Sequence, residues 1–147
     1  MSADRDEGPV FFLDHALGRH YVADALRECG LQVEVLTDYF AVDTKDPAWM
    51  REVASRGWVV VTKDKRLSYH HLEPEAARAF GLRMFVLRSG NLNRRELQAV
   101  FVKAARRMVA VARAEPAPFV ARIYKDGSVR IWKSAEDLGR SGTQNTS

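Results

Sequence analysis

The stretch that decides the fold is residues 46–64, which reads DPAWMREVASRGWVVVTKD. Asp46 before Pro47 is typical of a helix start, because an acidic side chain caps free N–H groups and proline suits the first helical position. Gly57 predicts the end of that helix. The apolar run from Trp58 to Thr62 does not alternate, which predicts a strand buried on both faces. A helix leading into a buried strand is the repeating unit of a parallel α/β sheet.

The same pattern extends in both directions from this stretch. Leu31–Leu36 alternates apolar and polar residues, which predicts a more exposed edge strand, and Cys29 is expected on the buried side of the preceding helix. The resulting order βαβαβαβ calls for a mainly parallel sheet with right-handed crossovers. Strands are predicted over Val10–Leu13, Leu31–Leu36, Trp58–Thr62 and Arg83–Leu87, and helices over Arg19–Cys29, Asp46–Arg56 and Glu73–Phe80.

A long basic helix and a hairpin are predicted to complete the domain. Asn93 and Glu96 have the spacing of a capping box, so the helix should start there and continue to about Arg113. Asp126-Gly127 predicts a tight turn between strands Phe119–Tyr124 and Val129–Lys133. We therefore expect one domain over 1–133, with a metal-site core at 10–87 and the helix and hairpin at 93–133. The polar segment 134–147 is expected to be a flexible tail.

Charge is distributed unevenly along the 147 residues. Residues 1–87 contain 11 Lys and Arg against 14 Asp and Glu, a net charge of −3, whereas residues 88–133 contain 11 against 3, a net charge of +8. A basic part beside an acidic part suits a polyanionic substrate, although a basic surface also serves solubility. With a single cysteine and no apolar stretch of membrane-spanning length, a cytoplasmic protein without membrane association is expected.

Three aspartates stand at strand ends or helix starts that a parallel sheet brings to one edge: Asp14, Asp46 and Asp64. Converging carboxylates repel one another unless a cation lies between them. Hard oxygen ligands without His or Cys at ligand spacing favour Mg²⁺ or Mn²⁺, which can activate water against a phosphodiester. Each aspartate also has a structural explanation, since Asp46 suits a helix cap, Asp14 a cap of the next turn, and Asp64 an Asx-turn.

Neighbouring polar residues are candidates for auxiliary roles. His15 follows the first aspartate and could reach the scissile phosphate, or it is an ordinary loop residue. The basic residues Lys63, Lys65 and Arg66 flank Asp64 and could contact phosphate, although a solvated charged turn explains them equally well. The spacing of the histidines does not suit a zinc site.

These residues resemble the PIN-domain ribonucleases, and within them the compact branch that includes VapC-type toxins. Phe11–Asp14 is similar to the opening strand and first metal aspartate of that family, and residues 46–64 resemble its helix, strand and Thr-x-Asp motif. The resemblance implies a three-layer α/β/α PIN-like fold. It also implies that Asp14, Asp46 and Asp64 bind the metal and act in catalysis, with Thr62 holding a ligand or water.

One feature departs from the family pattern. PIN domains usually supply a further acid, most often Glu, from a helix between the first two aspartates, and here Asp38 and Asp43 are the available substitutes. Two alternatives therefore stay open: a non-catalytic PIN-like module that binds RNA or a protein, and a receiver-type phosphoryl-transfer domain. The latter needs paired acids after the first strand, which Asp14-His15 does not supply.

The expected function is that of a Mg²⁺- or Mn²⁺-dependent endoribonuclease, the toxin of a toxin–antitoxin pair. Its expected partners are an RNA substrate and a cognate antitoxin protein, and a homodimer is a further expectation. The basic helix would hold the RNA backbone through Arg94, Arg95, Arg106 and Arg107.

Overall fold

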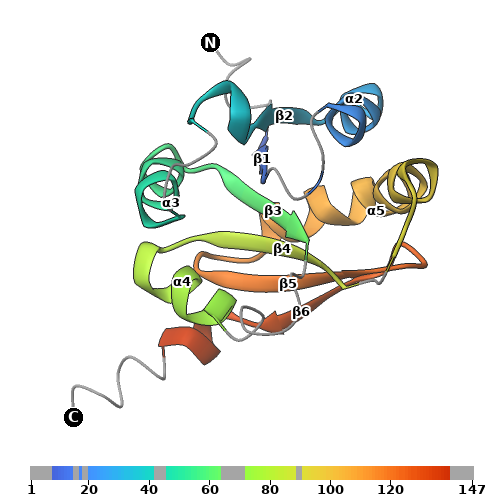
Figure 1. Cartoon of the computed structure of the whole chain (residues 1–147). Helices are drawn as coiled ribbons and strands as arrows, with labels where there is room; N and C mark the ends of the chain where they lie inside the picture. Colours follow the sequence, from blue (N-terminus) through green and yellow to red (C-terminus); the bar gives the residue numbers. More distant parts are fainter. Residues whose placement is uncertain are drawn as a thin grey trace.

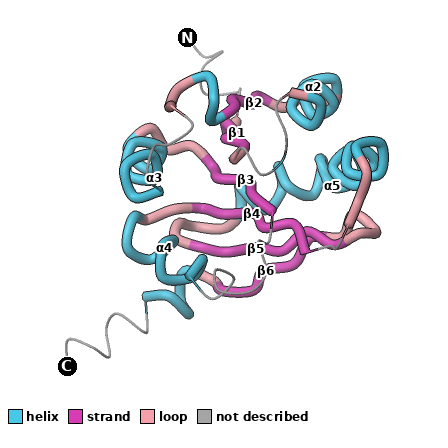
Figure 2. Tube along the Cα trace, viewed as in Figure 1, coloured by secondary structure: helices cyan, strands magenta, loops and turns pink. Residues whose placement is uncertain are grey.

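One sheet of six strands forms the centre of the molecule. The structure is a computed structural model that describes residues 8–14, 17, 20–41, 46–63, 72–88 and 91–139. The strand order is β2-β1-β3-β4-β5-β6; β1 to β5 are parallel and β6 is antiparallel to β5 (Figures 1 and 2). The strands are β1 (Val10–Leu13), β2 (Gln32–Val35), β3 (Val59–Lys63), β4 (Arg83–Arg88), β5 (Phe119–Tyr124) and β6 (Val129–Lys133).

Helices cover both faces of this sheet. They are α2 (Tyr21–Glu28), the short 3₁₀ helix η2 (Leu36–Asp38), α3 (Asp46–Ser55), α4 (Leu72–Phe80) and α5 (Arg94–Ala114). One core cluster joins the sheet to α2 and α5, and includes Phe11, Phe85 and Phe101. The second joins the opposite face to α3 and α4, and includes Phe12, Trp49 and Ala77. The predicted three-layer α/β/α architecture is confirmed, and so is the position of the second strand at the sheet edge.

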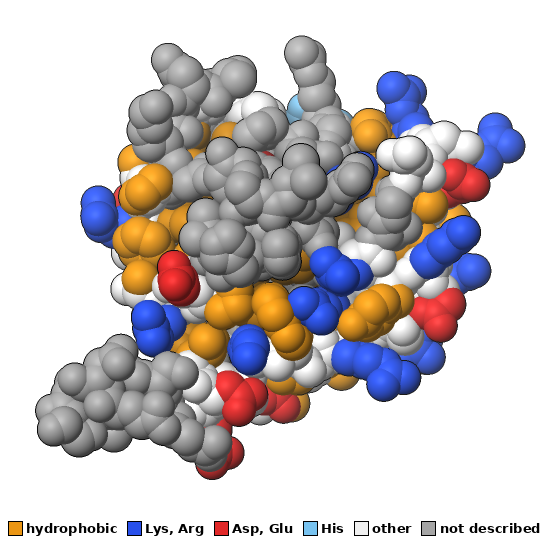
Figure 3. All heavy atoms as spheres, turned by 60° about the horizontal axis from the view of Figure 1, so that its bottom comes forward, with side chains coloured by type: hydrophobic (Ala, Val, Ile, Leu, Met, Phe, Trp, Pro, Cys, Tyr) orange, Lys and Arg blue, Asp and Glu red, His pale blue; other side chains and the backbone are white. Residues whose placement is uncertain are grey.

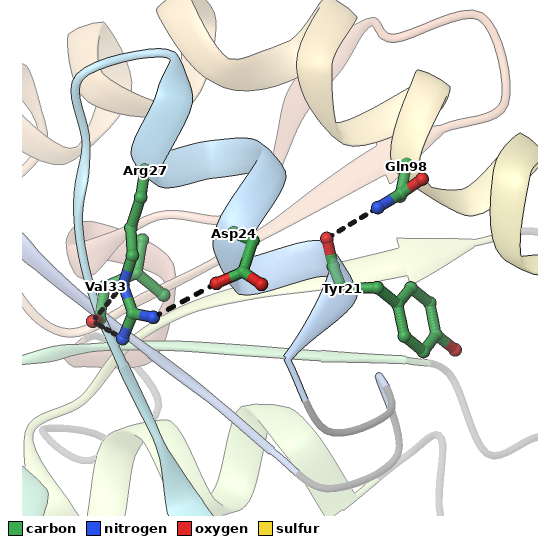
Figure 4. Close-up of polar contacts among 5 residues, drawn as sticks. All are labelled: Tyr21, Asp24, Arg27, Val33 and Gln98. Carbon is green, nitrogen blue, oxygen red and sulfur yellow. Dashed lines mark hydrogen bonds and ion pairs between the residues drawn. The ribbon is translucent and has the colours of Figure 1, made fainter.

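Helix α2 is fixed to its neighbours at both ends. The Arg27 guanidinium donates two hydrogen bonds, of 3.2 and 2.6 Å, to the carbonyl of Val33 in β2. The Gln98 amide of α5 donates one of 2.8 Å to the Tyr21 carbonyl (Figure 4). These contacts hold the helix that follows β1 against β2 and α5.

The prediction that Cys29 is a buried core residue is wrong. Helix α2 ends at Glu28, Cys29 is its exposed C-cap, and Gly30 continues the turn with φ +92°. Because the chain leaves the helix at this point, the residue that completes the buried stripe with Val22 and Leu26 is Ala23.

The long helix and the hairpin form as predicted. Asn93 accepts a hydrogen bond from the backbone of Glu96, whose side chain accepts one from the Asn93 backbone, so the capping box is confirmed. In the hairpin turn, the Asp126 carboxylate accepts a 2.9 Å hydrogen bond from the Ser128 backbone. Hydrogen bonding from Ser128 lowers the pKa of Asp126 below its ordinary value.

The start of the expected flexible tail is folded. Residues 135–139 form one helical turn, and Ser134 and Asp137 exchange hydrogen bonds of 2.9 and 3.1 Å between side chain and backbone. Leu138 is buried, with 5% of its surface exposed, in the core cluster of α3 and α4. Leu138, the one large apolar residue of this segment, therefore packs a stretch that its polar composition suggested would be loose. Residues 140–147 lie outside the described residues.

Candidate active site

The strand order places the topological switch point of the sheet between β1 and β3. The chain passes from β1 to β2 on one side, and β3 then pairs with β1 on the other side. The crossovers that follow β1 and β3 therefore run in opposite directions. In α/β sheets, ligands bind at such a switch point, just beyond the carboxyl ends of the two strands. Asp14 directly follows β1, and Thr62 lies near the end of β3. Two of the predicted residues thus belong to the switch point of the sheet.

Asp14 and Thr62 contact each other directly. The Thr62 hydroxyl donates a 2.7 Å hydrogen bond to Oδ2 of Asp14, and the Asp14 backbone N–H donates one of 3.0 Å to the Val61 carbonyl. The two residues are the buried polar residues of the described chain, with 3% and 6% of their surface exposed. Burying a carboxylate is unfavourable unless its oxygens are hydrogen-bonded or a cation is near. The Thr62 hydroxyl supplies one such bond and orients the carboxylate.

Of the other two aspartates, the structure describes only the backbone of Asp46. Asp46 begins α3, as predicted, but its side chain lies outside the description. Asp64 follows Lys63, the last residue of β3, and lies outside the described residues, as do the predicted auxiliary residues His15, Asp43, Lys65 and Arg66. β3 pairs with β1, and the convergence of Asp46 and Asp64 with Asp14 stays a prediction.

Hard oxygen donors at this edge suit the chemistry of Mg²⁺ or Mn²⁺. Asp14 offers a buried, oriented carboxylate of this kind. Asp38 lies exposed in η2, and the described part of the chain contains no group of three or more His, Cys, Asp or Glu side chains that could hold an ion. That Asp46 and Asp64 complete a metal site with Asp14 stays a prediction, because neither of their side chains is among those described.

The predicted RNA-binding residues are spread over different layers. Lys63 is one residue from Thr62 in β3, so strand alternation places it on the opposite face of the sheet. Arg94, Arg95, Arg106 and Arg107 are exposed on α5, which also packs against that opposite face. Arg94 covers the Tyr21 ring at 4.7 Å, near the sheet edge of Asp14, whereas Arg107 donates to the Gly127 carbonyl at 3.4 Å. The structure does not gather these arginines beside Asp14.

A different basic group shares the face of Asp14 and Thr62. Thr62 pairs with Val86, Val86 with Arg122, and Arg122 with Arg130, so these side chains point to one face of the sheet. Arg88 follows Val86 by two residues and points the same way. The Arg122 guanidinium lies over the Trp132 ring, 3.6 Å from its centre. Sequence reasoning missed this group because alternation within a strand does not reveal which face meets the active site.

Basic side chains are visible on this side of the molecule. Blue Lys and Arg side chains are spread across the face that Figure 3 turns toward the viewer, the lower side of Figure 1, where β5 and β6 lie. Arg88 and Arg130 are exposed, and Arg122 and Trp132 are half-buried.

A second arginine group lies at the amino ends of the strands, away from Asp14. Arg56, Arg83 and Arg113 line a cavity of about 580 Å³ there. Arg83 donates hydrogen bonds of 2.9 and 2.8 Å to the carbonyls of Ala112 and Gly57, at the ends of α5 and α3. Burial lowers the pKa of Arg83. Because its donors satisfy helix-terminal carbonyls, this arginine is explained by capping.

Comparison with known proteins identifies one family. A family model described as a PIN-like domain matches residues 9–89, more than half of the chain, and PIN-like domains are generally nucleases. No curated protein and no solved structure matches the chain. Among the described residues, none of the helices has the length and apolar character needed to span a membrane.

Proposed function

Because the chain belongs to the PIN-like domain family, we propose that it is a metal-dependent endoribonuclease that hydrolyses RNA phosphodiester bonds. The observation that carries the proposal is the buried hydrogen bond between Thr62 and Asp14 at the switch point of the sheet. Family membership alone gives a nuclease in general. RNA as the substrate is inferred from the resemblance of residues 46–64 to PIN-domain ribonucleases and from the basic surface between residues 88 and 133.

In this proposal the chain's own residues bind and orient. Asp14 would hold the ion together with Asp46 and Asp64, and the Thr62 hydroxyl keeps the Asp14 carboxylate in one orientation. Bound Mg²⁺ or Mn²⁺ supplies an activated water and neutralises charge that develops on the phosphate. Burial of Asp14 places its carboxylate where electrostatic attraction for a cation is stronger than in water. No side-chain nucleophile is needed.

The direct test is cleavage of single-stranded RNA by the purified protein. We expect cleavage with added Mg²⁺ or Mn²⁺, none in EDTA, and a loss of at least about 100-fold in the variant Asp14→Asn, as for removal of one electrostatic catalytic group. Asp24→Asn is the matched control, because Asp24 is exposed on α2 and pairs only weakly, at 3.4 Å, with Arg27. Full activity in folded Asp14→Asn would contradict the proposal.

We further propose that this nuclease is the toxin of a toxin–antitoxin pair and acts in the cytoplasm. The support is the resemblance of residues 10–87 to the compact VapC-type branch. Induced expression in a bacterial host should stop growth, and the Asp14→Asn variant should not. A neighbouring gene for a small protein with a helix-turn-helix pattern should restore growth when co-expressed. Unaffected growth would assign the nuclease to another process.

A non-catalytic PIN-like module is the second candidate. It is favoured by the departure from the family pattern, because Asp38, one of the two substitutes for the further acid, is exposed in η2. Thermal melting with and without Mg²⁺ or Mn²⁺ separates the candidates, because an ion that binds only the folded state raises the melting temperature. A module that has lost its metal site should show no such rise, and the Asp14→Asn variant should then melt identically with and without the ion.

A further inference from the structure

We propose that the carboxyl halves of β4 and β5, together with the antiparallel strand β6 beside them, bind the single-stranded RNA on one side of the cleavage site. The binding residues are Arg88, Arg122, Arg130 and Trp132, which we call the sheet strip. This inference rests on the proposed ribonuclease function, because it takes Asp14 as the place where the chain is cut. It assigns substrate binding to the sheet instead of to the arginines of α5.

The strand register places the sheet strip on the correct face. Thr62, Val86, Arg122 and Arg130 are successive cross-strand partners, and Thr62 is hydrogen-bonded to Asp14. Neighbouring strands are about 4.8 Å apart, so Arg130 is about 14 Å from Thr62 across the sheet. At roughly 3.4 Å per stacked nucleotide, that span corresponds to about four nucleotides. An RNA strand held at Asp14 therefore reaches the arginines within a few residues.

The exposure of these side chains shows where the RNA would lie. Val86 has 1% of its surface exposed, so the RNA strand cannot contact the sheet at that residue. Arg88 and Arg130 are exposed, and their long side chains extend past the buried row. In Figure 1, α3 and α4 lie over the left-hand ends of the strands, and β4 to β6 continue to the right beyond them. The side chains of Arg88 and Arg130 thus form the exposed part of the strip.

Arg122 and Trp132 contact each other within the strip. The guanidinium lies over the indole ring at 3.6 Å from its centre, which is close for a cation–π contact and holds the side chain in place. Lys133 also lies near this ring, at 5.6 Å. A planar guanidinium fixed on an aromatic ring can accept a stacked base on its outer face and donate to phosphate at its edge. Unpaired bases are needed for such stacking, which favours single-stranded RNA over a duplex.

Charge complementarity supports RNA as the occupant. The strip contributes three arginines from three adjacent strands, and β4, β5 and β6 contain no Asp or Glu. Phosphate contacts of this kind produce binding that depends on salt but little on base sequence. An acidic protein segment is the competing occupant, and binding to a poly-glutamate peptide tests for it separately.

Binding can be measured without cleavage. The full chain in EDTA is titrated against a fluorescent single-stranded RNA of about ten nucleotides, a length typical of such sites, and anisotropy is followed at several salt concentrations. We expect Arg130→Gln and Arg122→Gln each to weaken binding by about fivefold or more. Each should also reduce the slope of log affinity against log salt by about 0.7, the value for one lost phosphate contact. Arg122→Lys keeps the charge and should restore the slope but not the full affinity.

Arg78→Gln is the matched control. Arg78 is exposed in the last turn of α4, so the same charge is removed outside the strip. This variant should bind RNA like the parent chain. All variants are first checked for an unchanged melting temperature. Because Arg130 is exposed, Arg130→Gln should not disturb folding.

Several results would overturn the inference. One is equal RNA binding by the Arg130→Gln variant and the parent chain, and another is equal affinity for duplex and single-stranded RNA. A third is that the strip variants lose binding to a poly-glutamate peptide but keep their binding to RNA, which would assign the strip to an acidic protein segment. The proposed function fails separately: RNA binding that depends on the strip, without metal-dependent cleavage, would support the strip and reject the nuclease. Cleavage that is unaffected by folded strip variants would retain the nuclease and reject the strip.

Discussion

The hydroxyl of Thr62 has a role at the scale of one residue that a methyl group cannot fill. It donates to the buried Asp14 carboxylate at 2.7 Å. Thr62→Val keeps the shape but removes the donor, so in metal-free protein we expect the free energy of unfolding to fall by about 1–3 kcal/mol, the range for the loss of one buried hydrogen bond to a carboxylate. Chemical denaturation measures this change. Thr62→Ser keeps the hydroxyl and should lose much less; equal stability of the Val variant and the parent would contradict this account.

At the scale of elements, the hairpin of β5 and β6 packs closely on α5 at Gly127. Gly127 has φ +86°, and a Cβ atom there would lie 2.5 Å from Cβ of Lys103. Gly127→Ala should therefore cost about 1–2 kcal/mol for the left-handed backbone and about 1–3 kcal/mol more for the contact with α5. The structure thus explains this glycine by helix packing as well as by the turn.

Gly30 provides the control for that prediction. It has φ +92°, and a Cβ there would meet no described heavy atom within 4 Å. Gly30→Ala should show the backbone cost alone. Denaturation of both variants gives the difference, and equal losses would show that the hairpin can move away from α5 at no cost.

For the whole molecule, residues 134–139 extend the fold beyond the hairpin. Leu138 has 5% of its surface exposed and packs in the cluster of α3 and α4. Leu138→Ala should lower the free energy of unfolding by about 2–4 kcal/mol through lost burial and a residual cavity. Val102→Ala is the control, since Val102 is 46% exposed, and it should change stability by less than about 0.5 kcal/mol. If the two variants were equally stable, the segment would not be part of the domain.

Much of this domain could be predicted from local patterns. The capping residues Asn93 and Glu96, the Asp126-Gly127 turn and the apolar run before Thr62 each act on their own neighbours, so their elements form where the sequence places them. Cys29 was misplaced because periodicity does not show where a helix ends, and α2 ends one residue earlier. Leu138 was missed because a single apolar residue has no local pattern.

The sequence by itself determined which segments are strands and that aspartates follow two of them, because burial and chain reversal depend on nearby residues. Only the tertiary structure decided that β1 pairs with β3, so that Thr62 reaches Asp14 across 48 positions of sequence. It also decided that Arg122 and Arg130 share the face of these two residues. The physical reason is that strand order and register follow from the packing of the whole core on both sides of the sheet, which no single segment contains.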